Sequence, residues 1–191
     1  MELNTNKQNT TVNIALTGLM GALVIVGTFL NIPIPALGDK TMISLGNVFC
    51  ILSGLLLGPL YGGAAAGVGS FIFDLMGGWA TSAPVTLVTK FIMAFVCGII
   101  AYGGDKTASN IKRLIIAAVT GSLTYCVLYI GKSYIEAVML GNAAEAVKQI
   151  LFIKGSTTLT NAVIADVCAV PLFIAIRKAL KRNHIQGKTH Y

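Results

Sequence analysis

Charged residues are scarce in this chain of 191 residues, where Lys, Arg, Asp and Glu together make up 11%. Ordinary soluble domains carry about 25% of these residues. Apolar residues make up 55% of the chain, and the mean hydropathy is +0.78. A soluble domain of this size could not bury that much apolar surface. The composition therefore disfavours a soluble enzyme, a disordered protein and a nucleic-acid-binding domain, and it predicts a protein surrounded by membrane lipid.

Motifs that indicate catalysis or nucleotide binding are also missing. The two histidines, His184 and His190, lie in a basic C-terminal stretch, and the chain has no HExxH motif. It has no GxxxxGK[ST] phosphate-binding loop, because the triplets at 131–133 and 187–189 match only the end of that motif. The four cysteines form no CxxC pair. We therefore expect no catalytic residues, no metal site and no cofactor.

Six apolar stretches approach the roughly 20 residues that a helix needs to cross a bilayer core. Prolines, glycines and charged residues separate them. They predict an all-α membrane protein with six transmembrane helices in one bundle, forming a single domain of residues 1–191 that ends in a basic tail, 181–191. The expected spans are about 11–30, 42–58, 60–77, 84–103, 112–135 and 157–180.

The distribution of Lys and Arg predicts the orientation of the chain. Six spans put both termini on one side of the membrane. If that side is the cytoplasm, nine basic residues lie in inner segments and three in outer loops, as the positive-inside rule requires. We expect the cell membrane of a bacterium, with two long outer loops at about 31–41 and 136–156. The second loop contains a short amphipathic stretch from Asn142 to Ile153.

Four ionisable side chains fall inside or at the ends of the expected spans, and they are Asp74, Lys90, Lys132 and Asp166. Ionisable groups in a membrane are costly and usually functional. A rise of about 1.5 Å per residue puts all four in the outer half of the membrane. They predict a polar pocket that is open to the outside.

Neighbouring residues add to this predicted pocket. Tyr125, Tyr129 and Lys132 are spaced by four and three residues, so they share one face of a helix. Aromatic faces with a few directed polar groups suit a small ligand that contains a ring. The candidate substrate-binding residues are Asp74, Lys90, Trp79, Thr86, Tyr125, Tyr129, Lys132, Asn161 and Asp166.

Structural roles for the same residues stay open. Asp74 and Lys90 could form an ion pair between two helices, and Asp166 could link helices without touching a ligand. Lys132 could extend to the lipid headgroups. Trp79 could be an interfacial belt residue, and the two tyrosines could serve in packing.

Two further features predict moving or interacting parts. The first outer loop carries Pro33, Pro35 and Asp39 and is longer than its two helices require, so we expect a lid over the pocket. Ala15, Gly18 and Ala22 form a face of small residues on the first span. Such a face lets another helix approach closely in lipid, which makes it a candidate docking surface.

Five short motifs occur together in the first half of the chain. They are Asn31-Ile-Pro-Ile-Pro, Ile43-Ser-Leu-Gly-Asn, Leu55-Leu-Leu-Gly-Pro-Leu-Tyr-Gly-Gly, Gly69-Ser-Phe-Ile-Phe-Asp-Leu and Ala83-Pro-Val-Thr-Leu-Val-Thr-Lys-Phe. Over roughly residues 10–104 this pattern resembles the substrate-binding S components of energy-coupling factor (ECF) transporters. The subgroup that the sequence most resembles contains S components for riboflavin and for pyridoxine- or hydroxymethylpyrimidine-like compounds.

The resemblance implies a protein that captures a vitamin and imports it with partners. These partners are a second membrane subunit and two ATP-binding subunits, which would explain the missing nucleotide site. The family pattern carries over Asp74 and Lys90. It departs at Asn47, where the family motif commonly reads Leu-Gly-Asp, and at Gly18 and Ala22, where the family often has Ala-x-x-x-Ala.

Other classes of function are weighed against this one. A stand-alone channel or ion-coupled carrier for a small polar solute would use Asp74, Lys90 and Asp166 as an ion or proton relay. A membrane enzyme is disfavoured because no nucleophile–base or metal constellation is visible. A non-transport assembly subunit is the remaining possibility.

Overall fold

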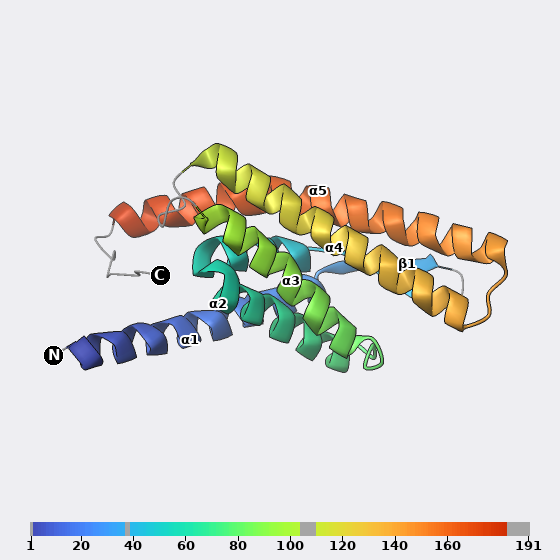
Figure 1. Ribbon diagram of the computed structural model, residues 1–191, viewed down its shortest axis with the longest axis horizontal. Helices are drawn as coiled ribbons and strands as arrows, with labels where there is room; N and C mark the ends of the chain where they lie inside the picture. The colour runs from blue at the N-terminus through green and yellow to red at the C-terminus, as the bar shows by residue number, and fades with distance from the viewer. Residues whose placement is uncertain (1, 37–38, 104–109, 183–191) are drawn as a thin grey trace.

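The computed structural model describes residues 2–36, 39–103 and 110–182, in which long helices run alongside one another and a β-hairpin lies at one end (Figure 1). Five helices are long and apolar enough to cross a membrane. The prediction of a helical membrane protein is confirmed, whereas six separate helices are not. In chain order the elements are α1 (Glu2–Phe29), β1 (Asn31–Ala36), β2 (Asp39–Ser44), α2 (Gly46–Met76), α3 (Ala83–Tyr102), α4 (Ile111–Met139) and α5 (Ala144–Arg182).

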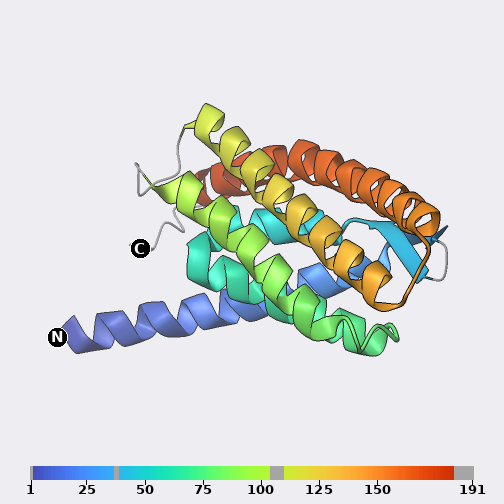
Figure 2. The ribbon, with the colours of Figure 1, turned by 45° about the vertical axis from the view of Figure 1, so that its right-hand side comes forward.

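The connections between elements gather at the two ends of the bundle. The hairpin, the turn from α2 to α3 and the connection from α4 to α5 lie at one end, which we call the hairpin end (Figures 1 and 2). The start of α1 and the end of α5 lie at the opposite end. This arrangement agrees with the predicted alternation of the chain, although the side that faces the cytoplasm stays a prediction.

Helix α2 covers two of the six predicted spans and reverses direction between them. Gly58 has a left-handed φ of 75°, and Pro59 follows it. A Cβ atom at Gly62 would lie 2.5 Å from the carbonyl oxygen of Ser53. In a straight helix these residues would be about 13.5 Å apart along the axis. The predicted spans 42–58 and 60–77 are therefore two arms of one element, a first arm of 46–57 and a second arm of 59–76.

Pro59 leaves one backbone acceptor without its helical donor, and α3 supplies a replacement. The carbonyl of Leu55 would accept a hydrogen bond from the N–H of residue 59, which proline lacks. Instead the hydroxyl of Tyr102 donates to the Leu55 oxygen at 2.7 Å. This bond ties the end of α3 to the reversal in α2.

The ends of the other predicted spans also differ from the structure. Helix α5 begins at Ala144 rather than at 157, so the stretch from Asn142 to Ile153, expected as part of an outer loop, is mostly the first turns of a single helix. At 39 residues α5 is about 58 Å long. Helix α1 has its apolar part at Thr10–Phe29, close to the predicted span 11–30. Of the predicted basic tail, 181–191, the first two residues end α5, and 183–191 lie outside the described residues.

The predicted loop 31–41 is instead an antiparallel hairpin. Pro33 pairs with Met42 and Pro35 pairs with Lys40. Because the two prolines are two residues apart, they occupy the same kind of pair, in which the backbone N–H points away from the partner strand. A strand can therefore include both prolines without losing a ladder hydrogen bond, which proline content alone does not reveal.

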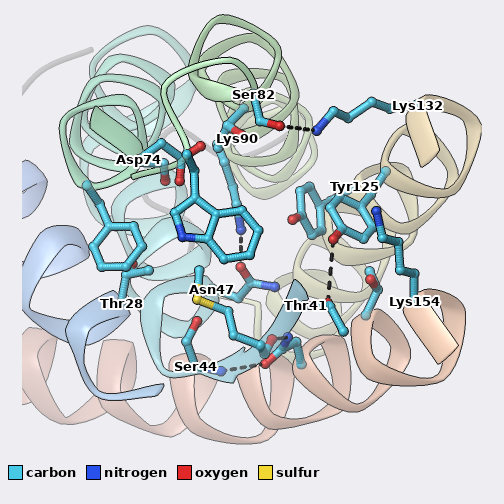
Figure 3. Close-up of a pocket in the computed structure, with 18 residues that line it drawn as sticks. Thr28, Thr41, Ser44, Asn47, Asp74, Ser82, Lys90, Tyr125, Lys132 and Lys154 are labelled. Atoms are coloured by element: carbon cyan, nitrogen blue, oxygen red, sulfur yellow. Dashed lines mark hydrogen bonds between the residues drawn. The ribbon is translucent and has the colours of Figure 1, made fainter. Parts of the chain in front are cut away.

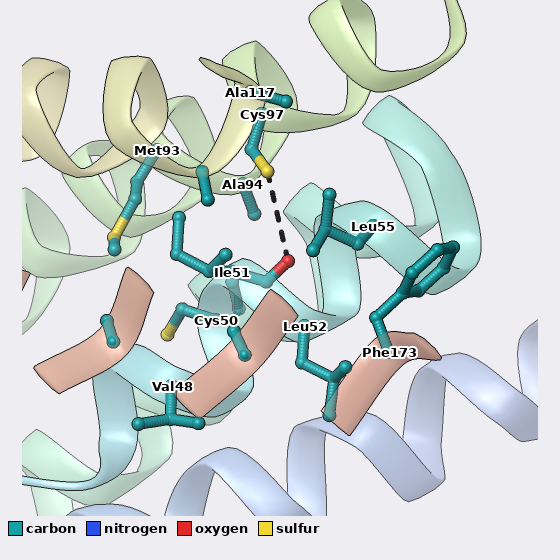
Figure 4. Close-up of a cluster of buried hydrophobic side chains, with 14 of the residues drawn as sticks. Val48, Cys50, Ile51, Leu52, Leu55, Met93, Ala94, Cys97, Ala117 and Phe173 are labelled. Atoms are coloured by element: carbon teal, nitrogen blue, oxygen red, sulfur yellow. Dashed lines mark hydrogen bonds between the residues drawn. The ribbon is translucent and has the colours of Figure 1, made fainter. Parts of the chain in front are cut away.

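Small residues let the helices pack closely in the half of the bundle away from the hairpin. A Cβ atom at Gly54 would lie 2.5 Å from the carbonyl oxygen of Ala94 on α3. Ile51, Leu55 and Met93 are fully buried among these close contacts (Figure 4). Dispersion contacts of this kind drive helix association where lipid removes the hydrophobic driving force. The packed half leaves the hairpin end as the place for a cavity.

We expect Tyr102→Phe to lower the free energy of unfolding by about 1–3 kcal/mol, because it leaves the Leu55 carbonyl without a donor. Thermal unfolding in detergent measures the change. Tyr134→Phe is the matched control, since Tyr134 is 53% exposed on α4. Equal unfolding temperatures for both variants and the unchanged protein would contradict this role of Tyr102.

Candidate ligand-binding cavity

A polar and aromatic cavity lies at the hairpin end (Figure 3). It is lined by residues of β2, of α1, α2, α3 and α5, of the turn between α2 and α3, and of the second half of α4. It contains about 740 Å³ of unfilled space, counting its open mouth. Its lining residues are Thr28, Thr41, Met42, Ser44, Asn47, Ser70, Phe73, Asp74, Trp79, Ser82, Thr86, Lys90, Tyr125, Tyr129, Lys132, Lys154, Thr158 and Asn161.

The structure brings eight of the nine sequence-derived candidates together in this lining. The exception is Asp166, which accepts a hydrogen bond from the Ser122 hydroxyl at 2.8 Å. This contact joins α4 to α5, so the helix-linking role left open for Asp166 matches its position.

Lys90 lies on α3 and is buried at 8% exposure. Its ammonium group donates a hydrogen bond to the side-chain oxygen of Asn47 and lies 3.9 Å from the centre of the Tyr125 ring. The ring face is negatively polarised and attracts the cation. Both partners are uncharged, so they stabilise the ammonium group without neutralising it.

Asp74 faces the same cavity from the end of α2. Gly78, with a left-handed φ of 81°, lets the chain turn back, and the N–H of Trp79 bonds to the Asp74 carbonyl at 2.8 Å. The turn places the only tryptophan of the chain beside the carboxylate. Among the described residues, Lys132 pairs with Glu136 and Lys148 with Glu145, and Asp74 and Lys90 do not form the ion pair considered from sequence.

Lys132 reaches from α4 toward the start of α3. Its ammonium group donates to the Ser82 hydroxyl at 2.9 Å and lies 3.1 Å from the Glu136 carboxylate. Lys132 is 15% exposed and Glu136 is 40% exposed, so this pair sits toward the solvent side of the cavity. The ammonium group is held by protein partners rather than extended away from the bundle.

Tyr125 and Tyr129 form an aromatic wall on α4. Their ring centres are 5.6 Å apart, with an angle of 31° between the planes. Phe73 and Trp79 line other parts of the cavity. Flat aromatic surfaces with charged groups at their edges can hold a planar ring and orient it.

Lys154 is a lining residue that the sequence reading missed. It was assigned to an outer loop, yet it is 4% exposed, and its ammonium group lies 6.0 Å from the centre of the Tyr129 ring. Lys154, Thr158 and Asn161 are spaced by four and three residues on α5 and share one face. That pattern was hidden because the sixth span was expected to begin at 157.

The hairpin covers the cavity with β2 rather than with the residues proposed for the lid. Thr41, Met42 and Ser44 of β2 line the cavity, whereas Pro33 and Pro35 lie on β1 and are exposed. Asp39 begins β2, and its side chain is outside the described set. Asn47, at the start of α2, adds the polar partner of Lys90.

Asn161 uses its side-chain amide to bind the backbone of β2. Its oxygen accepts from the N–H of Ser44 at 2.9 Å, and its nitrogen donates to the carbonyl of Met42 at 2.8 Å. A residue that sequence analysis assigned to ligand binding is thus engaged with the hairpin.

The candidate docking residues lie away from the cavity, on α1. Ala15, Gly18 and Ala22 are exposed, and none of them lines the cavity. A Cβ atom at Gly18 would have no neighbouring atom within 4 Å. The face is open to another helix, as expected from its small residues.

Comparisons with known proteins identify relatives of the chain. The family model for the S component of the ECF-type riboflavin transporter matches residues 8–178. A protein from Pyrococcus woesei, described as an uncharacterized protein in a gap 3' region, is 31% identical over 114 residues, which are 60% of this chain and 72% of that protein. A solved structure described as the S component of a bacterial ECF transporter has a TM-score of 0.58 and 19% identity, covering 95% of this chain and 99% of that one.

We expect a ligand that enters the cavity to change the fluorescence of the protein, because Trp79 lines the cavity and is the only tryptophan. A fluorescence titration in detergent measures the change. In a control carrying Trp79→Phe and Phe152→Trp, the sole tryptophan moves to a position that is 76% exposed on α5. Its emission should then not respond. Unchanged wild-type fluorescence at saturation, established by dialysis, would exclude Trp79 from the ligand site.

Proposed function

We propose, since the chain belongs to the family of ECF-type riboflavin transporter S components, that it captures a water-soluble vitamin or related micronutrient and delivers it for ATP-driven import. The observation that carries the proposal is the cavity at the hairpin end, where aromatic walls surround buried charged groups. Transport of this kind involves no chemical change of the ligand. Purification under native conditions, followed by mass spectrometry of the extracted small molecule, tests both the class of function and the substrate.

Riboflavin is the vitamin that we propose for the cavity. The matching family model bears its name, and its flat ring system suits a site lined by Phe73, Trp79, Tyr125 and Tyr129. One edge of that ring system alternates hydrogen-bond acceptors with a donor. Lys90 can donate a hydrogen bond to an acceptor on this edge, and Asp74 can accept one from the donor. The two charged side chains together can therefore recognise the edge of the ring system. Pyridoxine, which lacks this edge, serves as the competitor in a binding assay.

The proposed orientation puts the hairpin end outside a bacterial cell membrane. The start of α1, the end of α3, the start of α4 and the end of α5 then face the cytoplasm, where most Lys and Arg residues would lie. The hairpin covers the cavity from the outside. It takes the role proposed for the loop 31–41, a lid that opens for the vitamin and closes over it.

The energy for import would come from partner proteins. The chain has no phosphate-binding loop, and the family resemblance implies a second membrane subunit and two ATP-binding subunits. We propose that the membrane subunit docks on the face of Ala15, Gly18 and Ala22. A stand-alone ion-coupled carrier finds less support, because Asp166 is separated from the cavity lining and bonded to Ser122.

Asp74→Asn and Lys90→Ala should each weaken vitamin binding while the protein still folds. Removing one partner of a buried charged interaction costs about 2–5 kcal/mol, or roughly 30-fold to several-thousand-fold in the dissociation constant. Titration of the purified, vitamin-free protein in detergent measures the constant.

Lys148→Ala is the matched control for this pair of variants, because Lys148 is an exposed lysine at the same end of the bundle. It should bind the vitamin normally. Normal affinity in both Asp74→Asn and Lys90→Ala would remove these residues from the site. Loss of folding would instead assign them a structural role.

Gly18→Trp and Ala22→Trp should abolish co-purification with the partner subunits and ATP-dependent uptake. The reason is steric, since association in lipid depends on close approach of helix backbones. Vitamin binding by the isolated chain should be nearly unchanged, because α1 at these positions does not line the cavity. Val26→Trp, a change from one exposed apolar side chain to another on α1, is the control. Normal assembly of both Trp variants would place the docking surface elsewhere.

A further inference from the structure

We propose that Asn161 is a latch that ties β2 to α5 and limits how fast the hairpin opens. Asn161 is then a positioning residue rather than a contact for the ligand. The proposal rests on the proposed function in one respect, since opening matters only if the cavity takes up a ligand. The latch itself is a property of the ligand-free protein.

The amide of Asn161 binds β2 in the manner of a neighbouring strand. Met42 and Ser44 occupy the same kind of pair as Pro33, so their backbone groups point away from β1 toward the free edge of β2. Asn161 accepts from the Ser44 N–H at 2.9 Å and donates to the Met42 carbonyl at 2.8 Å. One residue of a parallel strand opposite Ile43 would make the same two bonds.

These bonds satisfy an edge that would otherwise be left open. A free strand edge exposes unpaired N–H and C=O groups, and burying them unpaired is costly. Ser44 is 8% exposed and Asn161 is 8% exposed, so water does not easily replace either bond. The hairpin is therefore held against α5 by polar bonds that must break before β2 can move away.

Other contacts hold the hairpin at different places. Near α1, the Asn31 side chain donates to the Thr28 carbonyl at 2.9 Å and the Leu45 N–H donates to the Leu30 carbonyl at 3.4 Å. These bonds lie where the hairpin joins the helices and can persist during opening. The Thr41 and Tyr129 hydroxyls are 3.5 Å apart, at the limit of a hydrogen bond. Asn161 supplies the two short bonds from β2 to α5, and Figure 3 labels Ser44, the residue at one of them.

A single amide makes both bonds, so they form and break together. The hairpin then has two defined positions, latched and open, instead of a gradual series. The bonds to β2 use one of the two amide N–H groups and one of the two oxygen lone pairs, and they fix the orientation of the amide. The latch therefore affects how fast a ligand enters and leaves more than how tightly it is held.

Hydrogen exchange of the Ser44 N–H tests the latch without any vitamin. In protein labelled with ¹⁵N-serine, Asn161→Ala should speed exchange at Ser44 by about 10- to 100-fold, or about 1.4–2.8 kcal/mol at about 1.4 kcal/mol per tenfold. Buried core amides such as Ser53 should keep their protection. Thr160→Ala is the control on the same helix, because the exposed Thr160 hydroxyl bonds only to the Ser156 carbonyl in the described chain.

Stopped-flow measurement of vitamin binding, with Trp79 emission as the signal, tests the consequence for function. The latch predicts that Asn161→Ala raises the association and dissociation rate constants together, each by about the same factor as Ser44 exchange, with a smaller change in their ratio. A direct contact with the ligand instead predicts faster dissociation alone and unchanged Ser44 exchange in the vitamin-free protein. That result would overturn the proposal.

If the Asn161→Ala variant does not fold, Asn161→Asp tests the latch instead. The carboxylate can still accept from Ser44 but cannot donate to the Met42 carbonyl, so exchange at Ser44 should rise less than full loss of the latch implies, yet above wild type. Wild-type exchange in this variant would count against the latch. A protein that shows the predicted exchange but binds no vitamin would refute the proposed function and leave the latch standing.

Discussion

Backbone N–H and C=O groups that lack a hydrogen-bond partner within the helices constrain the architecture, because a membrane interior offers no water to serve as that partner. The reversal at Gly58 and Pro59 removes a donor from α2, and Tyr102 supplies it from α3. The free edge of β2 meets the amide of Asn161 on α5. At these two places, a side chain from a distant helix completes the backbone. The completions tie α2 to α3 and β2 to α5, and these four elements contribute to the cavity lining.

The helices pack closely in one half of the bundle, and the other half contains the polar cavity. In one half, Gly54 and Gly121 bring helix backbones nearly into contact, and apolar side chains form a buried cluster. In the other half, tyrosines, lysines and Asp74 keep the helices apart and leave a cavity. Charged groups are tolerated there because each has a neighbour that stabilises it, as the Tyr125 ring and Asn47 do for Lys90. The closely packed half can therefore hold the cavity walls in place during the hairpin opening that we propose.

The helical membrane fold and eight of the eighteen cavity-lining residues followed from the sequence, because ionisable residues stand out in apolar helices. Asp74, Lys90 and Lys132 are examples. The hairpin could not be predicted from the sequence, because Pro33 and Pro35 resemble loop residues unless their strand pairing is known. The start of α5 was missed because Lys148 and Lys154 interrupt its apolar pattern. The proposed role of Asn161 depends on its contact with Ser44, which is 117 residues away in the sequence. Helical periodicity cannot reveal such a contact.

The amide at Asn47 changes the charge balance of the cavity relative to the Leu-Gly-Asp motif that the family commonly carries at this point. A carboxylate at this position would neutralise the Lys90 ammonium group in a buried ion pair. The amide of Asn47 instead accepts one hydrogen bond from Lys90 and leaves the positive charge in place. That charge faces the same cavity as Asp74. Under the proposed function, the departure at residue 47 would make the cavity more strongly polarised and would favour a ligand whose edge presents an acceptor to Lys90 and a donor to Asp74.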